Sequence, residues 1–216
     1  MLDFEKCPNC DAAIKKTTFS SNELLSANDT AIINEYNSEK KTGYCNKCSL
    51  KPFKESVNKL KSEITQLKTD LRTLIKYIPI LTIQNLPGWN YKILDMVTGQ
   101  STTGTGAITE FTSSFTDFFG VQSNRHNSKI KAGEELCQAQ LRTFAYEMGG
   151  NAVIGADIDY SDSGDGKGML IVCMSGTAIL AEESCFSASQ QKGLALLKSK
   201  RERLNYLRKF KLYVVA

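Results

Sequence analysis

The stretch Gly149–Gly166, "GGNAVIGADIDYSDSGDG", places four aspartates among glycines and serines. Gly149 or Gly150 suits the left-handed conformation that ends a helix, and residues 151–160 then alternate as a strand with one apolar face does. The text that follows, "SDSGDGKG", has the composition of a hairpin connection. Because the aspartates lack the register and the distal glutamate of a calcium loop, the stretch predicts a helix stop, a core strand and a turn.

Helical and extended patterns alternate around this strand. A helix is predicted over 128–148, with the following apolar residues along one face: Ile130, Cys137, Leu141, Phe144 and Met148. Further strands are predicted at 80–86, 91–102 and 168–179. A shorter helical spacing is carried by Ile108, Phe111, Phe115 and Phe118. The text "NRHN" at 124–127 predicts a loop, and the whole of 80–180 predicts one domain.

Four motifs in this domain occur in a specific order. They are Leu86-Pro-Gly-Trp-Asn-Tyr-Lys-Ile, Val97-Thr-Gly99, Gly149-Gly-Asn-Ala-Val-Ile-Gly155 and Gly176-Thr-Ala178. The ordered set resembles the YbjQ-type family, which carries the label "putative heavy-metal-binding domain". The resemblance implies an α+β fold, in which one main helix packs on a small antiparallel sheet as in a dodecin-like subunit. It also implies a ring of five subunits and supplies no catalytic residues. Residues 120–127 lack the Gly-Gly-Arg-Ser text that the resemblance leads us to expect there.

The composition excludes several classes of protein. With 216 residues, 41% apolar and 23% charged, the chain is typical of a soluble globular protein with a main domain and a smaller part. No apolar run approaches the length of a membrane span. The N-terminal residues lack the basic and apolar regions of a signal peptide, so we expect a cytoplasmic protein.

Two of the cysteine spacings predict a metal site. Cys7-Pro-Asn-Cys10 and Cys45-Asn-Lys-Cys48 are Cys-x-x-Cys pairs, and two such pairs in a cytosolic protein favour a tetrahedral zinc site over disulfides. We predict that residues 1–50 form a zinc-ribbon-like domain holding structural Zn²⁺. A catalytic zinc is disfavoured, since four thiolates leave no open position. A thioredoxin-like redox role is weaker still, because neither pair lies in a βαβ pattern.

Residues 51–79 show a heptad pattern. The a positions are Val57, Ile64, Leu71 and Ile78, and the d positions are Phe53, Leu60, Leu67 and Leu74. Pro52 suits a first helical turn, and Pro79 ends the pattern. The strict periodicity favours self-association as a coiled coil. The alternative is an amphipathic helix that lies on its own domain.

The 80–180 domain offers soft ligands without a cluster. They are Met96, His126, Cys137, Met169, Cys173 and Met174, and no two of them are closely spaced as a ligand pair. Buried cysteines usually act as small hydrophobes, so a second metal site here is disfavoured. His126 is the only histidine, and its polar surroundings predict an exposed loop residue rather than a catalytic base. The glycines of 99–107 lack the spacing of a phosphate-binding loop.

The C-terminal segment 181–216 is basic. Residues 186–216 contain eight lysines or arginines and one glutamate, whereas the rest of the chain has a net charge of −3. Leu194, Leu197, Leu204 and Leu207 lie near one helical face. The favoured interpretation is an amphipathic helix that docks on its own assembly. Contact with a membrane surface and contact with nucleic acid are the alternatives.

Three functional hypotheses follow. The first is a non-enzymatic oligomeric scaffold, in which a YbjQ-like ring displays zinc-ribbon heads for protein contacts. The second is a heavy-metal-binding or metal-responsive protein. An enzyme that uses Asp157 and Asp159 is the weakest, because no catalytic constellation surrounds them.

Overall fold

The computed structural model describes residues 5–16, 21–103, 125–162 and 170–212. Two units are separated by their contacts. Unit 1 comprises Met1–Leu71 with Lys198–Ala216, and unit 2 comprises Arg72–Leu197. The C-terminal segment is therefore shared between the two units. None of the helices among the described residues combines the length and the hydropathy that a membrane span requires.

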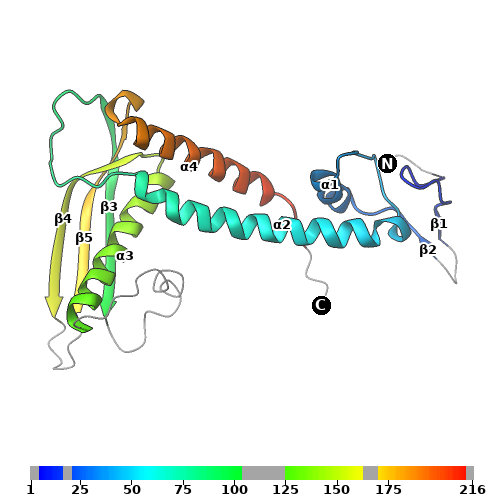
Figure 1. The fold of residues 1–216 in the computed structure, drawn as a ribbon, viewed down its shortest axis with the longest axis horizontal. Helices are drawn as coiled ribbons and strands as arrows, with labels where there is room; N and C mark the ends of the chain where they lie inside the picture. Colours follow the sequence, from blue (N-terminus) through cyan, green and yellow to red (C-terminus); the bar gives the residue numbers. More distant parts are fainter. Residues whose placement is uncertain (1–4, 17–20, 104–124, 163–169, 213–216) are drawn as a thin grey trace. The chain divides into compact units, whose positions relative to one another are not determined.

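Unit 2 is an α+β domain. Its antiparallel sheet has the order β3-β5-β4, formed by β3 (Tyr91–Thr103), β4 (Ala152–Asp162) and β5 (Leu170–Ala181). The helix α3 (Arg125–Glu147) lies along one face of this sheet (Figure 1). The fold class predicted from the sequence, a small antiparallel sheet with one main packed helix, is confirmed.

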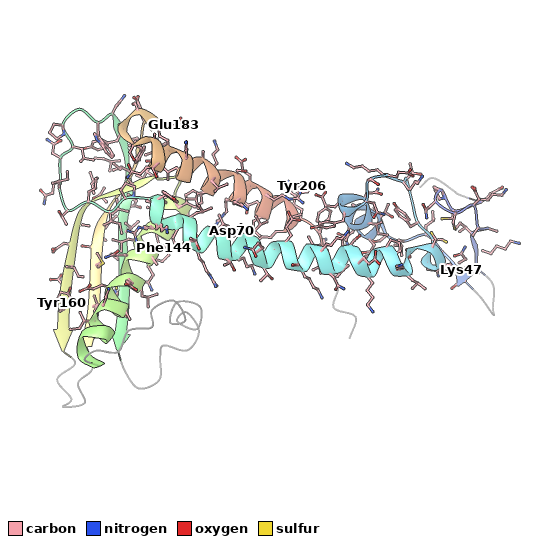
Figure 2. The ribbon with its side chains drawn as sticks, viewed as in Figure 1. Lys47, Asp70, Phe144, Tyr160, Glu183 and Tyr206 are labelled. Atoms are coloured by element: carbon pink, nitrogen blue, oxygen red, sulfur yellow. The ribbon has the colours of Figure 1, made fainter. Side chains whose placement is uncertain are left out.

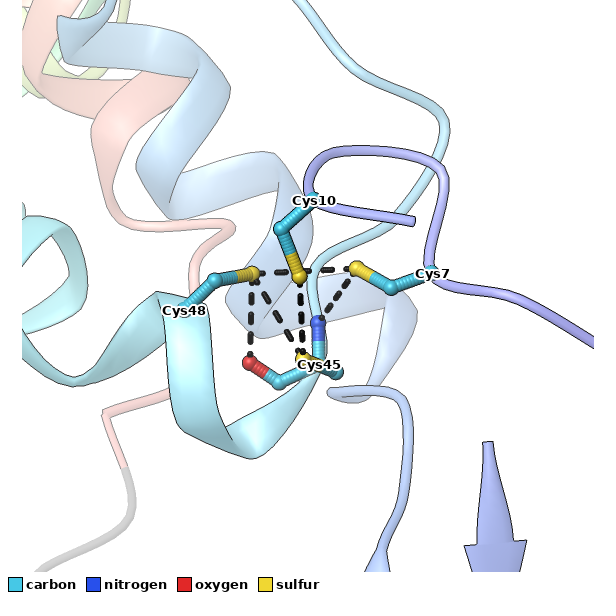
Figure 3. Close-up of side chains that lie close together, drawn as sticks. All are labelled: Cys7, Cys10, Cys45 and Cys48. Atoms are coloured by element: carbon cyan, nitrogen blue, oxygen red, sulfur yellow. Dashed lines mark hydrogen bonds between the residues drawn. The ribbon is translucent and has the colours of Figure 1, made fainter. Parts of the chain in front are cut away.

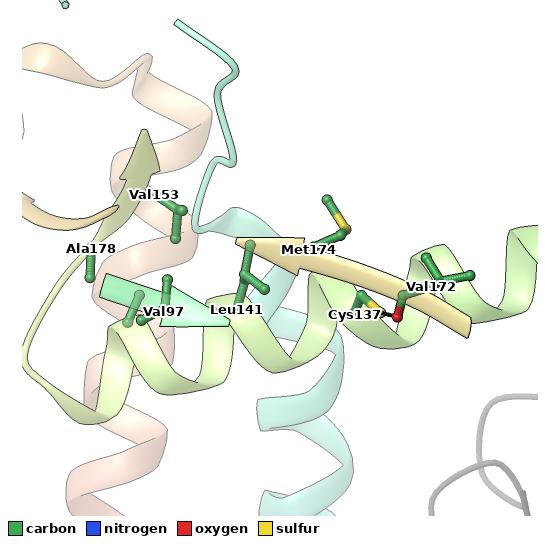
Figure 4. Close-up of a cluster of buried hydrophobic side chains, with 8 residues drawn as sticks. Val97, Cys137, Leu141, Val153, Val172, Met174 and Ala178 are labelled. Atoms are coloured by element: carbon green, nitrogen blue, oxygen red, sulfur yellow. Dashed lines mark hydrogen bonds between the residues drawn. The ribbon is translucent and has the colours of Figure 1, made fainter. Parts of the chain in front are cut away.

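The core lies between α3 and the sheet. Leu141 and Cys137 of α3 contact Val97, Val172 and neighbouring residues of the strands, all of them buried (Figure 4). Gly99 lets the helix approach closely, since a Cβ atom there would lie 2.6 Å from the carbonyl oxygen of Cys137. The glycine of the Val97-Thr-Gly99 motif therefore has a packing role.

The strand predicted from the opening stretch is β4. Gly149 ends the helical segment with a φ of +85°, and the N–H of Gly150 donates to the carbonyl of Ala145 at 2.7 Å. Asn151 then holds the end of β5, because its side chain donates to the carbonyl of Ala181 at 2.7 Å and accepts from the N–H of the same residue at 2.8 Å. The helix stop and the core strand are confirmed. Most of the predicted turn lies outside the described residues.

A second cluster explains the Leu86-Pro-Gly-Trp motif. Leu86 and Phe186 are buried with residues of β4 and β5, and Trp89 packs against them. The rings of Trp89 and Phe186 meet edge to face, with 5.3 Å between their centroids. The motif thus covers one end of the sheet.

Two predictions of local structure in unit 2 were wrong. Residues 80–86 do not form a regular strand. Ile80 makes an isolated parallel bridge to Val153, and residues 79–83 exchange backbone hydrogen bonds with residues 153–156, where β4 is irregular between Ile154 and Asp157. The helix α3 begins at Arg125 and not after "NRHN", since no glycine or proline interrupts its polar first turn. The helical spacing at 108–118 lies outside the described residues.

Unit 1 is built on a long helix. The helix α2 (Asn46–Leu74) contains Pro52 and begins one and a half turns before it, so the prediction that Pro52 lies in the first turn was wrong. The 3-10 helix η1 (Ile75–Tyr77) follows α2. The rest of unit 1 is a short hairpin of β1 (Lys15–Lys16) and β2 (Ser21–Asn22), the helix α1 (Ala27–Tyr36) and the second half of α4 (Ala188–Leu207).

The apolar face formed by the a and d positions of the heptad pattern, here called the heptad stripe, packs within the chain. Leu60 and Leu67 are buried against Ile32 of α1 and against Leu204 and Leu207 of α4. This is the arrangement of an amphipathic helix that lies on its own domain. Self-association through the stripe stays a prediction, but its apolar partner positions are already filled by α1 and α4.

Ion pairs fix the second half of α4 on the other two helices. Arg203 donates through Nε to Glu63 Oε1 at 2.7 Å and through a terminal nitrogen to Glu35 Oε1 at 2.6 Å. Tyr36 donates to Glu63 as well, at 2.7 Å. The Arg203 guanidinium, helped by Tyr36, holds the pKa of Glu63 below its usual range. A second pair joins Lys200 to Asp70 at 2.7 Å.

Replacing Arg203 tests this network. We expect Arg203→Gln to lower the free energy of unfolding of unit 1 by about 1–2 kcal/mol, because Glu35 and Glu63 lose a charged donor while remaining partly buried. Chemical denaturation monitored by circular dichroism measures the change. Arg208→Gln is the matched control, since Arg208 is exposed. Equal effects of the two variants would contradict the prediction.

Candidate metal centre

The four predicted cysteines meet at one point. The Sγ atoms of Cys7 and Cys48, of Cys10 and Cys45, and of Cys45 and Cys48 are each 3.7 Å apart (Figure 3). All four sulfurs lie within 4.8 Å of one another. The structure therefore brings together residues that are up to 41 positions apart in the sequence.

The sulfur spacing matches tetrahedral coordination. A zinc–sulfur bond of about 2.3 Å gives a sulfur–sulfur edge of about 3.8 Å in a regular tetrahedron, whereas a disulfide requires about 2.05 Å. The observed 3.7 Å edges agree with the first arrangement. The donor set is soft and fits zinc or another thiophilic metal. Such a set of four thiolates is closed, because no position remains for water or substrate.

The first cysteine pair lies in a tight turn. The N–H of Asp11 donates to the carbonyl of Cys7 at 2.9 Å, and the N–H of Cys7 donates to the carbonyl of Ala12 at 2.8 Å. Asp11 adopts a φ of 56°, a left-handed conformation that aspartate tolerates better than most residues do. This turn carries Cys7 and Cys10 on the same side.

The second pair lies at the start of α2. The carbonyl of Cys45 accepts the N–H of Ser49 at 3.0 Å, and Cys48 belongs to the first helical turn. An isolated bridge joins Cys45 to Leu24, just after β2. The unsatisfied N–H groups and the partial positive charge of a helix start favour thiolates. The pair therefore occupies a helix start and not a turn between two strands.

The four thiols oppose one another's ionisation. Burial raises the pKa of Cys45, but N–H groups of Cys48 and Lys47 and the neighbouring thiols outweigh it and lower this pKa to about 6. The N–H of Ala12 lowers the pKa of Cys10, but desolvation and the other three thiols outweigh it and raise this pKa to about 12. Ionisation of one sulfur thus opposes ionisation of the next, which a divalent metal relieves.

A backbone donor supports the cluster from outside the four sulfurs. The N–H of Cys45 donates to Cys7 Sγ at 3.2 Å, so the two pairs are joined directly. Cys7 and Cys45 are fully buried, whereas Cys10 is exposed. The buried half of the site faces the body of unit 1.

The other candidate ligands do not assemble. In the part of the chain that the structure describes, the four N-terminal cysteines are the only group of three or more histidine, cysteine, aspartate or glutamate side chains arranged to hold a metal. Cys137 is buried and donates to the carbonyl of Val172 at 3.3 Å, and burial raises its pKa to about 11. Met96 is exposed, and Met174 lies in the core. Met169 and the side chain of His126 lie outside what the structure describes.

The aspartates of the opening stretch do not form a catalytic site. Asp157 and Asp159 are exposed on β4, at alternate positions of one strand. The side chains of Asp162 and Asp165 lie outside the described residues. Among the described residues, the structure therefore shows no acid–base partner for Asp157 or Asp159, and the enzyme hypothesis gains no support.

Sequence reasoning missed a polar hollow beside the metal centre. Its volume is about 240 Å³. Its lining residues are Asn9, Asn37, Ser38, Glu39, Lys41, Tyr44 and Pro52. Asn9 lies between Cys7 and Cys10 in the sequence, so the hollow adjoins the metal centre. The lining residues share no spacing or motif, so the sequence offered no signal for it.

The fold and the site define the class of protein: an α+β domain with a four-cysteine, metal-binding type of module attached. The family model described as "Putative heavy-metal-binding", YbjQ, matches residues 78–182. A UPF0145 protein of Clostridium kluyveri is 40% identical over 87 residues, which are 40% of this chain and 82% of that protein. The chain therefore belongs to the YbjQ (UPF0145) family.

Other UPF0145 relatives match a similar share of the chain. A UPF0145 protein of Clostridium botulinum strain Eklund 17B is 35% identical over 106 residues, 48% of this chain and 98% of that protein. One of Acetivibrio thermocellus is 37% identical over 87 residues, 40% of this chain and 82% of that protein. A crystal structure of a Pediococcus pentosaceus protein of unknown function has a TM-score of 0.32 and 20% identity, over 49% of this chain and 98% of that one. The four cysteines lie outside the residues that the family model matches.

Proposed function

We propose that this protein is a non-enzymatic oligomeric scaffold, in which YbjQ-type domains assemble through their sheets and carry zinc-bound four-cysteine modules. The observation that supports it best is the free edge of β3. The sheet has two edge strands, β3 and β4. The start of β4 is covered by residues 79–83, through hydrogen bonds such as the one from Leu81 N–H to the Val153 carbonyl at 2.8 Å. Among the described residues, β3 pairs only with β5 and leaves its other edge open.

The open edge has the character of an interface. β3 runs for 13 residues, and long unprotected edges pair readily with another chain. Ile93 and Met96 on this strand are 64% and 67% exposed, which is unusual for large apolar residues of a sheet. The family resemblance adds the expectation of a ring of five subunits. A cytoplasmic location would keep the thiols reduced and available to the metal.

Native mass spectrometry of the full chain at micromolar concentration tests the assembly. We expect a mass that is a multiple of the single chain, with one zinc ion per chain. Replacing Ile93 and Met96 together by lysine should shift the population to single chains, because charge on a strand edge opposes pairing. Leu196→Lys on α4, which is 46% exposed, is the control. A single-chain mass for the unaltered protein would overturn the proposal.

A heavy-metal-binding or metal-responsive protein is the second candidate. The description of the family favours it, and the four cysteines lie outside the residues that the family model matches. This function requires a metal site that remains when the cluster is destroyed. A full-length Cys7→Ser/Cys45→Ser variant that still binds cadmium or mercury at one ion per chain would support it over a purely structural metal.

Membrane association through the basic tail is less well supported than either. Membrane binding would require Leu204 and Leu207 to insert into the lipid surface. Both side chains are instead buried against α1 and α2. Arg203 and Lys200 are engaged in ion pairs. In the structure, the second half of α4 therefore packs on α1 and α2 and completes the core of unit 1.

A further inference from the structure

The solvent-facing side of α2 carries four lysines at intervals of seven residues. They are Lys47, Lys54, Lys61 and Lys68, here called the lysine stripe. All four are exposed, and Figure 2 labels Lys47 in the first turn of the helix. Seven residues are nearly two helical turns, so the four side chains share one face at intervals of about 10 Å along about 32 Å. The stripe is therefore a line of charge and not a loose cluster.

The charge of the stripe is not compensated locally. None of the four lysines has an acidic residue three or four positions away along the helix. A helix that is merely solvated usually intersperses such pairs. Among the residues that the structure describes, none of these lysines takes part in an ion pair. Their ammonium groups remain available to an external anion.

Two of the three acidic residues of α2 lie on a different flank. Glu63 pairs with Arg203 of α4, and Asp70, which Figure 2 labels, pairs with Lys200 of α4. Glu55 is exposed, but it does not lie three or four positions from any lysine of the stripe, so the stripe itself contains lysines and no acids. The apolar face of α2 is also occupied, because Leu60 and Leu67 are buried.

We infer that the lysine stripe binds the phosphate backbone of double-stranded DNA, without sequence preference. A line of lysines on one helical face is the electrostatic footprint of a phosphate-binding surface. The interval of about 10 Å is close to the width of the major groove, about 12 Å, and flexible lysine stems take up the difference. Successive lysines thereby reach phosphates on the two sides of a groove.

The residues within the stripe distinguish this partner from two others. Single strands are held largely by stacking on aromatic side chains, and the positions between the lysines on this face include Asn58 and Thr65 instead. A lipid surface requires a row of apolar side chains that enter the bilayer boundary, but Leu50 is the only large apolar residue of α2 that is exposed, and Leu60 and Leu67 are buried in unit 1. Duplex DNA requires only positive charge on a rigid support.

Fluorescence anisotropy with the full chain and a 30-base-pair duplex of mixed sequence tests the inference. We expect micromolar binding at about 50 mM salt, with a log–log salt slope of about −3 to −4 from four phosphate contacts. The fourfold variant Lys47→Gln/Lys54→Gln/Lys61→Gln/Lys68→Gln should weaken binding at least tenfold and remove most of that slope. Glutamine preserves helix propensity, so circular dichroism should be unchanged.

A second fourfold variant of equal net charge is the control. It replaces four exposed lysines away from the stripe: Lys40, Lys59, Lys192 and Lys198. We expect it to bind DNA within about threefold of the unaltered protein. Equal losses in the two variants would show a general charge effect and overturn the inference. So would preference for a single strand of the same length, or binding to phosphatidylserine vesicles in the absence of DNA binding.

Discussion

Cys45→Ser is expected to abolish metal binding and to unfold the four-cysteine module. Cys45 is fully buried, lies 3.7 Å from two other sulfurs and donates its N–H to a third. Its loss removes one of four ligands and leaves the other thiols without a shared cation. Structural zinc supplies about 10–16 kcal/mol of apparent binding free energy, which exceeds the stability of a small module. The zinc content measured by native mass spectrometry should fall from one ion per chain to none.

The loss of structure should be local. Amide resonances of residues 5–45 should collapse to random-coil positions, while those of unit 2 keep their dispersion, because the two units have separate cores. Cys185→Ser is the matched control, since Cys185 is a free, partly exposed cysteine of unit 2. A Cys45→Ser protein that retains one tightly bound zinc and folded α1 would show that the cluster is not the metal site.

Leu60→Ala is expected to destabilise unit 1 by about 2–5 kcal/mol without changing the mass of the assembly. Leu60 is fully buried between α1 and α4, and truncating it leaves a cavity in a core of few large residues. Thermal or denaturant unfolding of the full chain measures the first effect. Native mass spectrometry measures the second.

This variant separates the two interpretations of the heptad stripe. In a coiled coil between chains, Leu60 occupies a d position of the seam, and its truncation lowers the oligomer mass. In the arrangement that the structure shows, it affects only the fold of unit 1. Leu50→Ala on the same helix, where Leu50 is 73% exposed, should change stability by less than about 0.5 kcal/mol. Loss of assembly by Leu60→Ala at unchanged stability would restore the coiled-coil interpretation.

The candidate metal site was largely predictable because its signal is chemical. Cys-x-x-Cys pairs have few uses in a reducing compartment, and both pairs converge as the sequence predicts. The sequence did not indicate that the second pair begins a helix. The position of the second pair depends on where α2 starts. The start expected from Pro52 lies more than one turn after the observed start of the helix. The polar hollow beside the metal centre could not be predicted from the sequence, because its lining residues come from three separate segments.

The basic tail, residues 181–216, was predictable only in outline. The sequence favoured a helix that docks on its own assembly, with a membrane surface or nucleic acid as alternatives, but it did not indicate that Arg203 and Lys200 bind Glu63, Glu35 and Asp70 of the same chain. The ion-pair partners lie more than 120 positions away in the sequence, as with Lys200 and Asp70 at 130. Exposed basic residues remain on the tail, such as Lys198 and Arg208, and the lysine stripe of α2 adds a regular row of exposed positive charge.

By itself the sequence determined the α+β domain and the four-cysteine set. The strand β4, the glycine that ends the preceding helical segment and the close contact at Gly99 follow from short-range rules of backbone and packing. Only the tertiary structure decided what covers the heptad face of α2, and which charges of the tail are neutralised. A periodic pattern defines which face of a helix is apolar but not what that face contacts, because the contacting residues on α1 and α4 come from distant parts of the chain.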